Sequence, residues 1–123
     1  MKYNIEVNEE QLKIIFDSVD LYSRLKCGQL KEIKNIFYDK TLDRESVDYA
    51  LQQLKILLFT DLTDNEYYGI YENRTPEESK IGYGISKFCK HQLHKDDESW
   101  SVYKDYPSEI SKKYQCKVVR IDG

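Results

Sequence analysis

Residues 9–27 carry apolar side chains around more than half of a helical circumference, and this pattern constrains the fold most strongly. At roughly 100° per residue, one apolar face runs from Leu12 to Tyr22 and a second runs from Ile14 to Leu25. A helix that is apolar on two faces needs neighbours on both. The pattern therefore predicts a central helix around which the rest of the chain packs.

Both ends of this helix are predicted by local chemistry. Asn8 is a typical N-cap residue, and Gln11 stands where its side chain can reach back and complete a capping box. Gly28 is suited to the left-handed conformation that ends many helices. We expect the helix to run from about Glu9 to Cys27.

Three further helices are predicted by apolar residues at helical spacing. They cover about 29–38, about 43–59 and about 75–94. A polar loop, 60–74, precedes the last helix, and a polar connector, 95–113, follows it. No internal repeat is visible.

The last helix has a strong start signal, because Thr75 can cap it and Pro76 suits its first position. Its apolar stripe contains Ile81, Ile85 and Phe88, and we expect these side chains to be buried. Gly84 lies on the same side, which predicts close helix packing there.

The two ends of the chain read as strands. Residues 2–7 alternate polar and apolar side chains, and residues 114–121 end in a β-branched run. Because an isolated strand is not stable, we expect the two to pair with each other or between subunits. The predicted fold class is mainly α (α+β): about four helices around a central N-terminal helix, with a small terminal strand pair, in a single domain over residues 1–123.

Composition narrows the functional classes. The net charge of −3 argues against a protein that coats nucleic acid non-specifically, since that function needs a broad basic field. Three widely spaced cysteines fit reduced thiols in the cytoplasm, and no apolar run is long enough for a membrane span. The eleven tyrosines suit interfaces and ligand pockets, although an AT-rich gene would also favour them.

The predicted corner between the first two helices is one candidate binding site. Arg24, beside Tyr22 and Gln29, could offer its planar fork of donors to a phosphate or carboxylate. Asp20 lies one helical turn before Arg24, so a solvent-exposed ion pair is the alternative.

The last helix supplies a second candidate, a basic face that could attract an anion or could simply be solvated. Its members are Lys80, Tyr83, Lys87, Lys90, His91 and His94. With Asp97, the two histidines suggest a metal site only weakly, because a third firm ligand is missing. No local pattern supplies a nucleophile with its base, and no cofactor motif is present.

Four short motifs, read in order, carry a family resemblance. They are Leu21-Tyr22-Ser23-Arg24, Gly28-Gln29, Tyr68-Gly69-Ile70 and Ile81-x-Tyr83-x-Ile85. On these motifs the chain resembles a group of small bacteriophage-encoded proteins, over most of its length. It departs from the group at Lys90, where arginine is usual, and at Gly84, where a polar or acidic residue is usual.

The resemblance implies a phage protein that acts in the host cytoplasm. Small accessory proteins of this kind commonly act by stoichiometric binding, so we expect a non-enzymatic protein that sequesters a nucleotide immune signal. The alternative is an inhibitor that binds a host defence or regulatory protein. A homodimer is also expected, from the predicted strand edges and the tyrosine-rich surface. The candidate ligand-binding residues are Tyr22, Arg24, Gln29, Tyr68, Tyr83, Lys87, Lys90 and His91.

Overall fold

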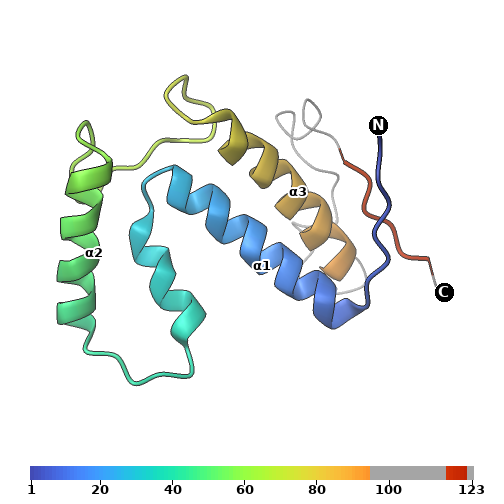
Figure 1. Cartoon of the computed structure of the whole chain (residues 1–123), viewed down its shortest axis with the longest axis horizontal. Coiled ribbons are helices and arrows are strands. Elements are labelled where there is room, and N and C mark those ends of the chain that lie inside the picture. The colour runs from blue at the N-terminus through green and yellow to red at the C-terminus, as the bar shows by residue number, and fades with distance from the viewer. Residues whose placement is uncertain (95–115, 122–123) are drawn as a thin grey trace.

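The computed structural model of the chain describes residues 1–94 and 116–121. Within them the chain forms four helices, as Figure 1 shows. These are α1 (Glu9–Lys26), the 3-10 helix η1 (Leu30–Phe37), α2 (Arg44–Leu58) and α3 (Glu77–His94). The prediction of a mainly helical chain is confirmed. None of these helices is both long enough and apolar enough to span a bilayer.

The ends of α1 form as the local chemistry predicts. The Asn8 side chain accepts a hydrogen bond from the Gln11 backbone N–H at 2.8 Å, and the Gln11 side chain accepts one from the Asn8 N–H at 2.9 Å. Gly28 adopts a φ of +93° after the helix ends, and a Cβ there would lie 2.7 Å from a methyl carbon of Leu62. Any larger residue would therefore be strained by both backbone and packing.

The helices α1 and α3 pack against each other through small side chains. The Ser23 hydroxyl donates to the Ser79 carbonyl oxygen at 2.6 Å, and the Ser79 hydroxyl donates back to the Ser23 carbonyl at 2.9 Å. Gly82 faces the same contact, because a Cβ there would lie 3.4 Å from the Ser23 Cβ and 3.5 Å from a methyl carbon of Val19. Small residues thus let the two backbones approach closely.

The expected apolar stripe of α3 is partly wrong. Phe88 is buried, but Ile81 is 42% exposed and Ile85 is half-buried. The stripe that faces α1 is built from Ser79 and Gly82 instead. These residues are about 100° or more away from Ile81 around the helix.

The second half of the helical body is a pair formed by η1 and α2. Asp43 caps α2 by accepting from the Ser46 backbone N–H at 3.4 Å, and it also accepts from the Ser46 hydroxyl at 2.8 Å. Across the pair, the Lys34 ammonium donates to the Asp48 carboxylate at 2.5 Å. Among the described elements, α2 contacts only η1, whereas α1 contacts both α3 and η1. Figure 1 shows α2 at the edge of the molecule.

Two predictions about the helices need correction. Residues 29–38 were expected to form a helix, and Leu30–Phe37 do so with the tighter 3-10 winding. The second apolar face of α1 is only partly covered, since Ile14 is 66% exposed. The short η1 reaches only part of α1, so one end of that face has no neighbour among the described helices.

The predicted terminal strand pair is wrong for the residues described. Residues 1–8 and 116–121 contain no strand, and they lie at the same end of the molecule in Figure 1. Tyr3 is 81% exposed and Ile121 is 71% exposed, so the alternating apolar side chains do not bury a face. Without such burial, a two-stranded ribbon has too little to stabilise it. The expected start of the second strand, at residues 114 and 115, lies outside the described residues.

The loop before α3 is fixed at both ends. Tyr68 donates its backbone N–H to the Cys27 carbonyl at 2.9 Å, which joins the loop to the end of α1. The Thr75 hydroxyl donates to the Gly69 carbonyl, and the Gly69 N–H donates to the Glu72 carboxylate. The predicted capping role of Thr75 needs correction: α3 begins at Glu77, two residues later, and the Thr75 hydroxyl anchors the loop instead.

Candidate functional site

A pocket of about 310 Å³ lies where α1, α3 and the loop before α3 meet. We call it the corner pocket. Its walls combine aromatic rings, cationic groups and one carboxylate. The lining residues are Phe16, Asp20, Ser23, Arg24, Cys27, Gln29, Tyr67, Tyr68, Gly69, Ile70, Tyr83, Ser86, Lys87 and Lys90.

Most of the candidate binding residues converge on this pocket. Those that line it are Arg24, Gln29, Tyr68, Tyr83, Lys87 and Lys90. The corner between the first helices and the basic face of α3, which were separate candidates in the sequence, therefore belong to one cavity.

Tyr22 and His91 do not line the pocket. Each is the sequence neighbour of a lining residue, Ser23 or Lys90, and neighbours on a helix point about 100° apart. Tyr22 is 49% exposed, and His91 is half-buried. Their predicted part in ligand binding, which came from the helix corner, the basic face and the family resemblance, therefore stays a prediction outside the corner pocket.

Arg24 makes the surface ion pair that was the alternative to ligand binding. Its Nε donates to Asp20 Oδ2 at 2.9 Å, and its Nη1 lies 3.7 Å from a carboxylate oxygen of Glu32. Nη1 also donates to the Gln29 side-chain oxygen at 3.1 Å. Among the contacts described for this side chain, none engages Nη2. The pairing engages Nε and Nη1, so Nη2 is the nitrogen of this side chain with no described acceptor.

Two lysines of α3 lie near aromatic rings of the pocket. The Lys87 ammonium is 5.2 Å from the centroid of the Tyr83 ring, and the Lys90 ammonium is 5.9 Å from that of Phe16. A cation within about 6 Å of a ring face is attracted by the ring quadrupole. Positive charge from α3 therefore lines the same pocket as Arg24.

The Tyr68 side chain is fixed by contacts with three other residues. Its hydroxyl donates to Asp61 at 2.6 Å, the Arg74 guanidinium carbon lies 4.8 Å from its ring centroid, and Phe59 packs edge-on at 5.8 Å. The hydrogen bond to Asp61 raises the pKa of the Tyr68 hydroxyl. Tyr68 thus shapes the pocket wall as a fixed part of the loop.

Phe16, Tyr67 and Ile70 line the pocket but were not among the binding residues predicted from the sequence. Phe16 lies two helical turns before Ser23 and Arg24, so its helical spacing could have identified it. Tyr67 and Ile70 enter from the loop, and loop placement follows no periodic pattern. Tyr67 was indicated only by its position beside Tyr68, and Ile70 only by the Tyr68-Gly69-Ile70 motif.

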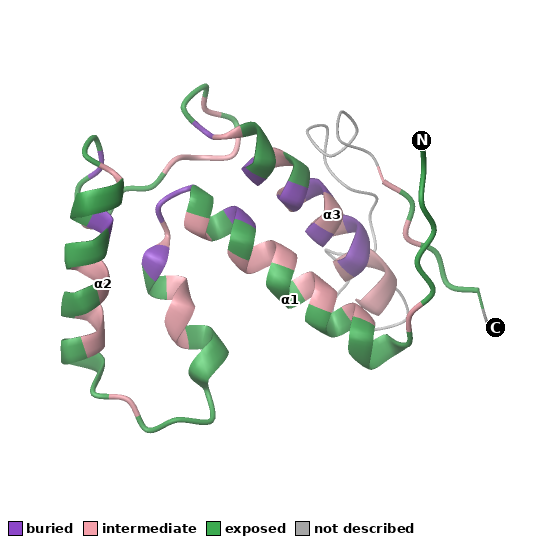
Figure 2. Ribbon diagram, viewed as in Figure 1, coloured by how far each residue is buried: buried purple, intermediate pink, exposed green. Residues whose placement is uncertain are grey.

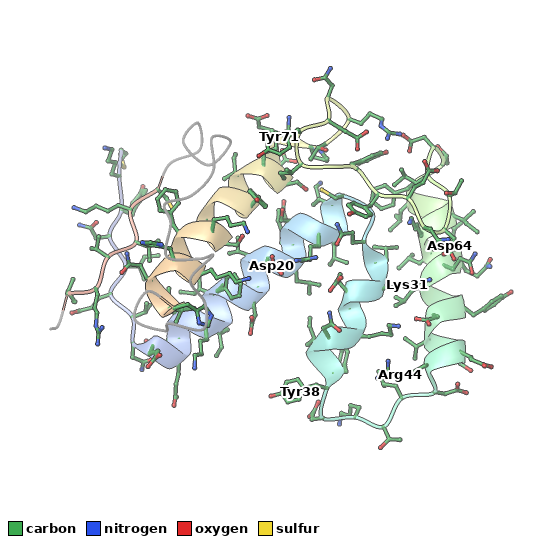
Figure 3. The ribbon with its side chains drawn as sticks, turned by 180° about the vertical axis from the view of Figure 1, so that it is seen from behind. Asp20, Lys31, Tyr38, Arg44, Asp64 and Tyr71 are labelled. Carbon is green, nitrogen blue, oxygen red and sulfur yellow. The ribbon has the colours of Figure 1, made fainter. Side chains whose placement is uncertain are left out.

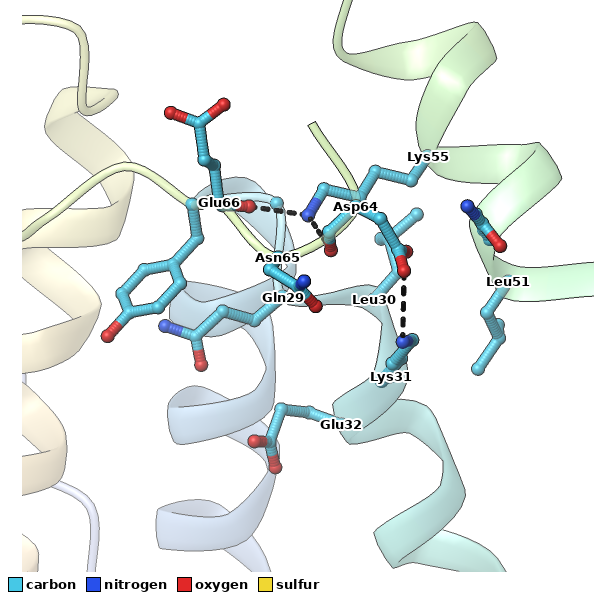
Figure 4. Close-up of a pocket in the computed structure, with 12 residues that line it drawn as sticks. Gln29, Leu30, Lys31, Glu32, Leu51, Lys55, Asp64, Asn65 and Glu66 are labelled. Carbon is cyan, nitrogen blue, oxygen red and sulfur yellow. Dashed lines mark hydrogen bonds and ion pairs between the residues drawn. The ribbon is translucent and has the colours of Figure 1, made fainter. Parts of the chain in front are cut away.

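A second pocket of about 230 Å³ lies between η1, α2 and the start of the loop, and it shares Gln29 and Tyr67 with the corner pocket. Figure 4 shows its central interaction, the Lys55 ammonium donating to the backbone carbonyls of Asp64, at 2.9 Å, and Glu66, at 2.5 Å. Burial lowers the pKa of this lysine, which is 7% exposed. Its donors already bind the loop, so we interpret Lys55 as a structural residue.

Charges around the second pocket are also paired within the chain. The Lys31 ammonium lies 3.6 Å from an Asp64 carboxylate oxygen. Figure 3 shows these two residues beside η1 and α2, with Asp20 on α1. The two lysines of the second pocket are thus engaged with groups of the chain.

Metal and nucleophile chemistry receive no support from the described residues. Within 1–94 and 116–121, no three His, Cys, Asp or Glu side chains come together as a metal site. Asp97, the third member of the weak metal motif, lies outside the described residues. Cys89 is 1% exposed, and burial raises the pKa of its thiol to about 11, which disfavours the reactive thiolate.

Comparisons with known proteins add no further constraint. The chain matches no protein-family model, and searches of curated proteins and of solved structures find no similar protein.

Proposed function

We propose that this protein binds a small anionic ligand with an aromatic part, such as a nucleotide, in the corner pocket, without chemically changing it. The observation that carries the proposal is the convergence of Arg24, Lys87 and Lys90 with several aromatic rings on one cavity of about 310 Å³. Ligand pockets commonly measure about 300–1,000 Å³ and combine apolar walls with a few polar groups. The cavity therefore fits a ligand of mononucleotide size.

The two sides of the pocket suit the two parts of such a ligand. The Nη2 group of Arg24 can donate to a phosphate, and the lysines of α3 add positive potential. Tyr67 and Phe16 offer ring surfaces against which a base can pack. Asp20 is the one carboxylate of the wall, and its bond to Arg24 Nε keeps it paired.

The resemblance to small phage-encoded proteins suggests the biological setting. We propose that the ligand is a nucleotide immune signal of the host and that the protein acts as an anti-defence sponge in the host cytoplasm. A sponge needs tight binding and no turnover. Recovery of the nucleotide chemically unchanged after denaturation of the complex distinguishes this function from hydrolysis.

A thermal-shift screen with cyclic and adenine-containing nucleotides tests the binding. A ligand at a hundredfold excess over its Kd stabilises the folded state by about 2.7 kcal/mol, which raises Tm by several degrees in a domain of this size. We expect Arg24→Ala to remove most of that shift, because charge-assisted hydrogen bonds are worth about 1.5–3 kcal/mol.

Arg44→Ala is the matched control, since Arg44 is exposed at the start of α2 and lines neither pocket. It should leave the shift unchanged. Without ligand, Arg24→Ala should change the unfolding free energy by about 1 kcal/mol or less, because its ion pair is largely exposed. Failure of every nucleotide to shift Tm would reject the proposed ligand class.

A second candidate function is inhibition of a host protein by direct binding. The observation that favours it is the exposure of large apolar residues on α2, including Leu57 at 77% and Leu58 at 60%. Self-association is the other use of such a surface, and we retain the homodimer as part of the proposal. The predicted terminal strand edges no longer support it.

A further inference from the structure

The second pocket has a buried acceptor that no described group of the chain satisfies. Asp64 lines this pocket, and its Oδ1 atom is buried and receives no hydrogen bond from residues 1–94 and 116–121. The other oxygen of this carboxylate lies 3.6 Å from the Lys31 ammonium. A buried acceptor without a donor is costly, and in native proteins such an atom usually meets a donor from water or from a ligand. The pocket therefore suits a group that donates a hydrogen bond.

The rest of the second pocket suits a neutral ring better than an anion. Its two cations are engaged, Lys31 with Asp64 and Lys55 with backbone carbonyls. Gly28 and Leu30 contribute buried wall, and Figure 2 shows this stretch between α1 and η1 in purple. The volume of about 230 Å³ leaves room for one ring system of nucleobase size.

Arg24 lies at the junction of the two pockets, which share Gln29 and Tyr67. Its Nη1 donates to the Gln29 side-chain oxygen at 3.1 Å and lies 3.7 Å from Glu32, which lines the second pocket. Its Nε donates to Asp20, which lines the corner pocket. A phosphate bound to this guanidinium therefore has both cavities within reach.

We propose that the two pockets together bind a dinucleotide, with its phosphodiester at Arg24 and one base in each pocket. The base in the second pocket carries an amino group, as adenine, guanine and cytosine do, and donates it to Asp64 Oδ1. The base in the corner pocket packs against Tyr67 and Phe16. The corner pocket alone reaches only the lower end of the usual range of ligand-pocket volumes, and the two pockets together fall well within it. This inference rests on the proposed function and names its ligand class.

Isothermal titration calorimetry with adenosine monophosphate (AMP) and with ApA, two adenosines joined by one phosphodiester, tests whether both pockets take part. We expect one ApA to bind per chain, at least about tenfold more tightly than AMP, because the second base binds intramolecularly once the first is bound. ApA that binds no more tightly than AMP overturns the inference and leaves the proposed function intact. If neither nucleotide binds, the proposed function fails and the inference fails with it.

The dinucleotides CpC and UpU test the role of Asp64, because uracil has a carbonyl oxygen where cytosine has its amino group. We expect the wild type to bind CpC at least about tenfold more tightly than UpU. Asp64→Asn should lose this preference, because an amide can also donate to the uracil oxygen, and it keeps the backbone carbonyl that Lys55 binds.

Asp48→Asn is the matched control for Asp64→Asn. Asp48 also pairs with a lysine, its side chain is 38% exposed against 35% for Asp64, and it lines neither pocket. This variant should keep the preference for CpC. Circular dichroism of both variants shows whether they remain folded.

The comparison of CpC with UpU in the wild type decides even if Asp64→Asn does not fold. Equal affinities of the wild type for the two dinucleotides overturn the inference and assign water to Asp64 Oδ1. A preference for CpC that persists in folded Asp64→Asn overturns it as well, because the amino group would then be recognised elsewhere.

Discussion

Lys55 joins α2 to the loop through its ammonium group, which donates to the carbonyl oxygens of Asp64 and Glu66. Lys55→Met keeps the length of the side chain but leaves both carbonyls without this donor. A buried polar group that loses its partner costs about 1–3 kcal/mol, and we expect that loss in the free energy of unfolding measured with urea.

Lys31→Met provides the comparison for Lys55→Met. The Lys31 side chain is 45% exposed and lies 3.6 Å from Asp64, so its removal should cost less than about 1 kcal/mol. Equal losses for the two substitutions would contradict the structural role that we assign to Lys55.

Titration of Cys89 should make the free energy of unfolding depend on pH in the alkaline range. Burial raises the pKa of its thiol from 9.0 to about 11, so the folded state favours the neutral thiol. The stabilisation that comes from keeping the thiol neutral is complete below about pH 9 and is lost as the pH rises to about 11. Because one pKa unit corresponds to about 1.36 kcal/mol, the loss is about 2–3 kcal/mol. We expect the stability advantage of the wild type over Cys89→Ala to shrink across this interval in denaturant titrations. A constant advantage would mean that the thiol does not titrate in this way.

At the scale of the elements, Gly82 sets how closely α1 and α3 approach. Gly82→Ala adds one methyl group at ordinary contact distance, 3.4 Å from Ser23 Cβ, and gains helix propensity worth up to about 1 kcal/mol. Gly82→Leu adds a side chain for which there is no room and should cost about 1–3 kcal/mol. Thermal unfolding of the two variants gives the order of stability. A leucine variant as stable as the alanine variant would show that the contact is looser than described.

The helices could be predicted from the sequence because their ends depend on neighbours in the chain. Asn8, Gln11 and Gly28 define α1 by bonds and dihedral angles within a few residues. The buried face of α3 is determined instead by α1. The Ser23 side chain and the backbone of α1 lie close to α3, so small residues are needed there. The stripe with the larger apolar side chains, including Ile81, was therefore the wrong guide.

The difference between features set by nearby residues and features set by helix packing also explains how much of the candidate site could be predicted. Arg24, Lys87 and Lys90 have helical positions that the sequence specifies, so their residue types and spacing pointed to a basic binding site. Their convergence depends on the packing of α1 on α3. Tyr67 depends on the path of a loop with no periodic pattern. Tyr22 and His91, which were predicted from the helix corner, the basic face and the family resemblance, do not line the corner pocket.

At the scale of the whole molecule, the described helices form two pairs, α1 with α3 and η1 with α2. The η1–α2 pair is local, since its helices are consecutive in the chain. The α1–α3 pair joins helices from the two halves of the described chain, and the corner pocket lies along it. The pocket is therefore a property of the complete arrangement, although most of its lining residues belong to α1 and α3.

The reciprocal serine bonds between α1 and α3 have a consequence for folding kinetics. Ser23 and Ser79 are 56 residues apart in the chain, and bringing such distant points together carries a loop-closure entropy of about 3–4 kcal/mol. Contacts of this range usually form late, so the walls of the pocket should meet only near the end of folding. A nucleotide bound there should then slow unfolding while leaving the refolding rate unchanged, as stopped-flow mixing with urea can measure. Faster refolding with nucleotide would instead place the meeting of α1 and α3 before the rate-limiting barrier.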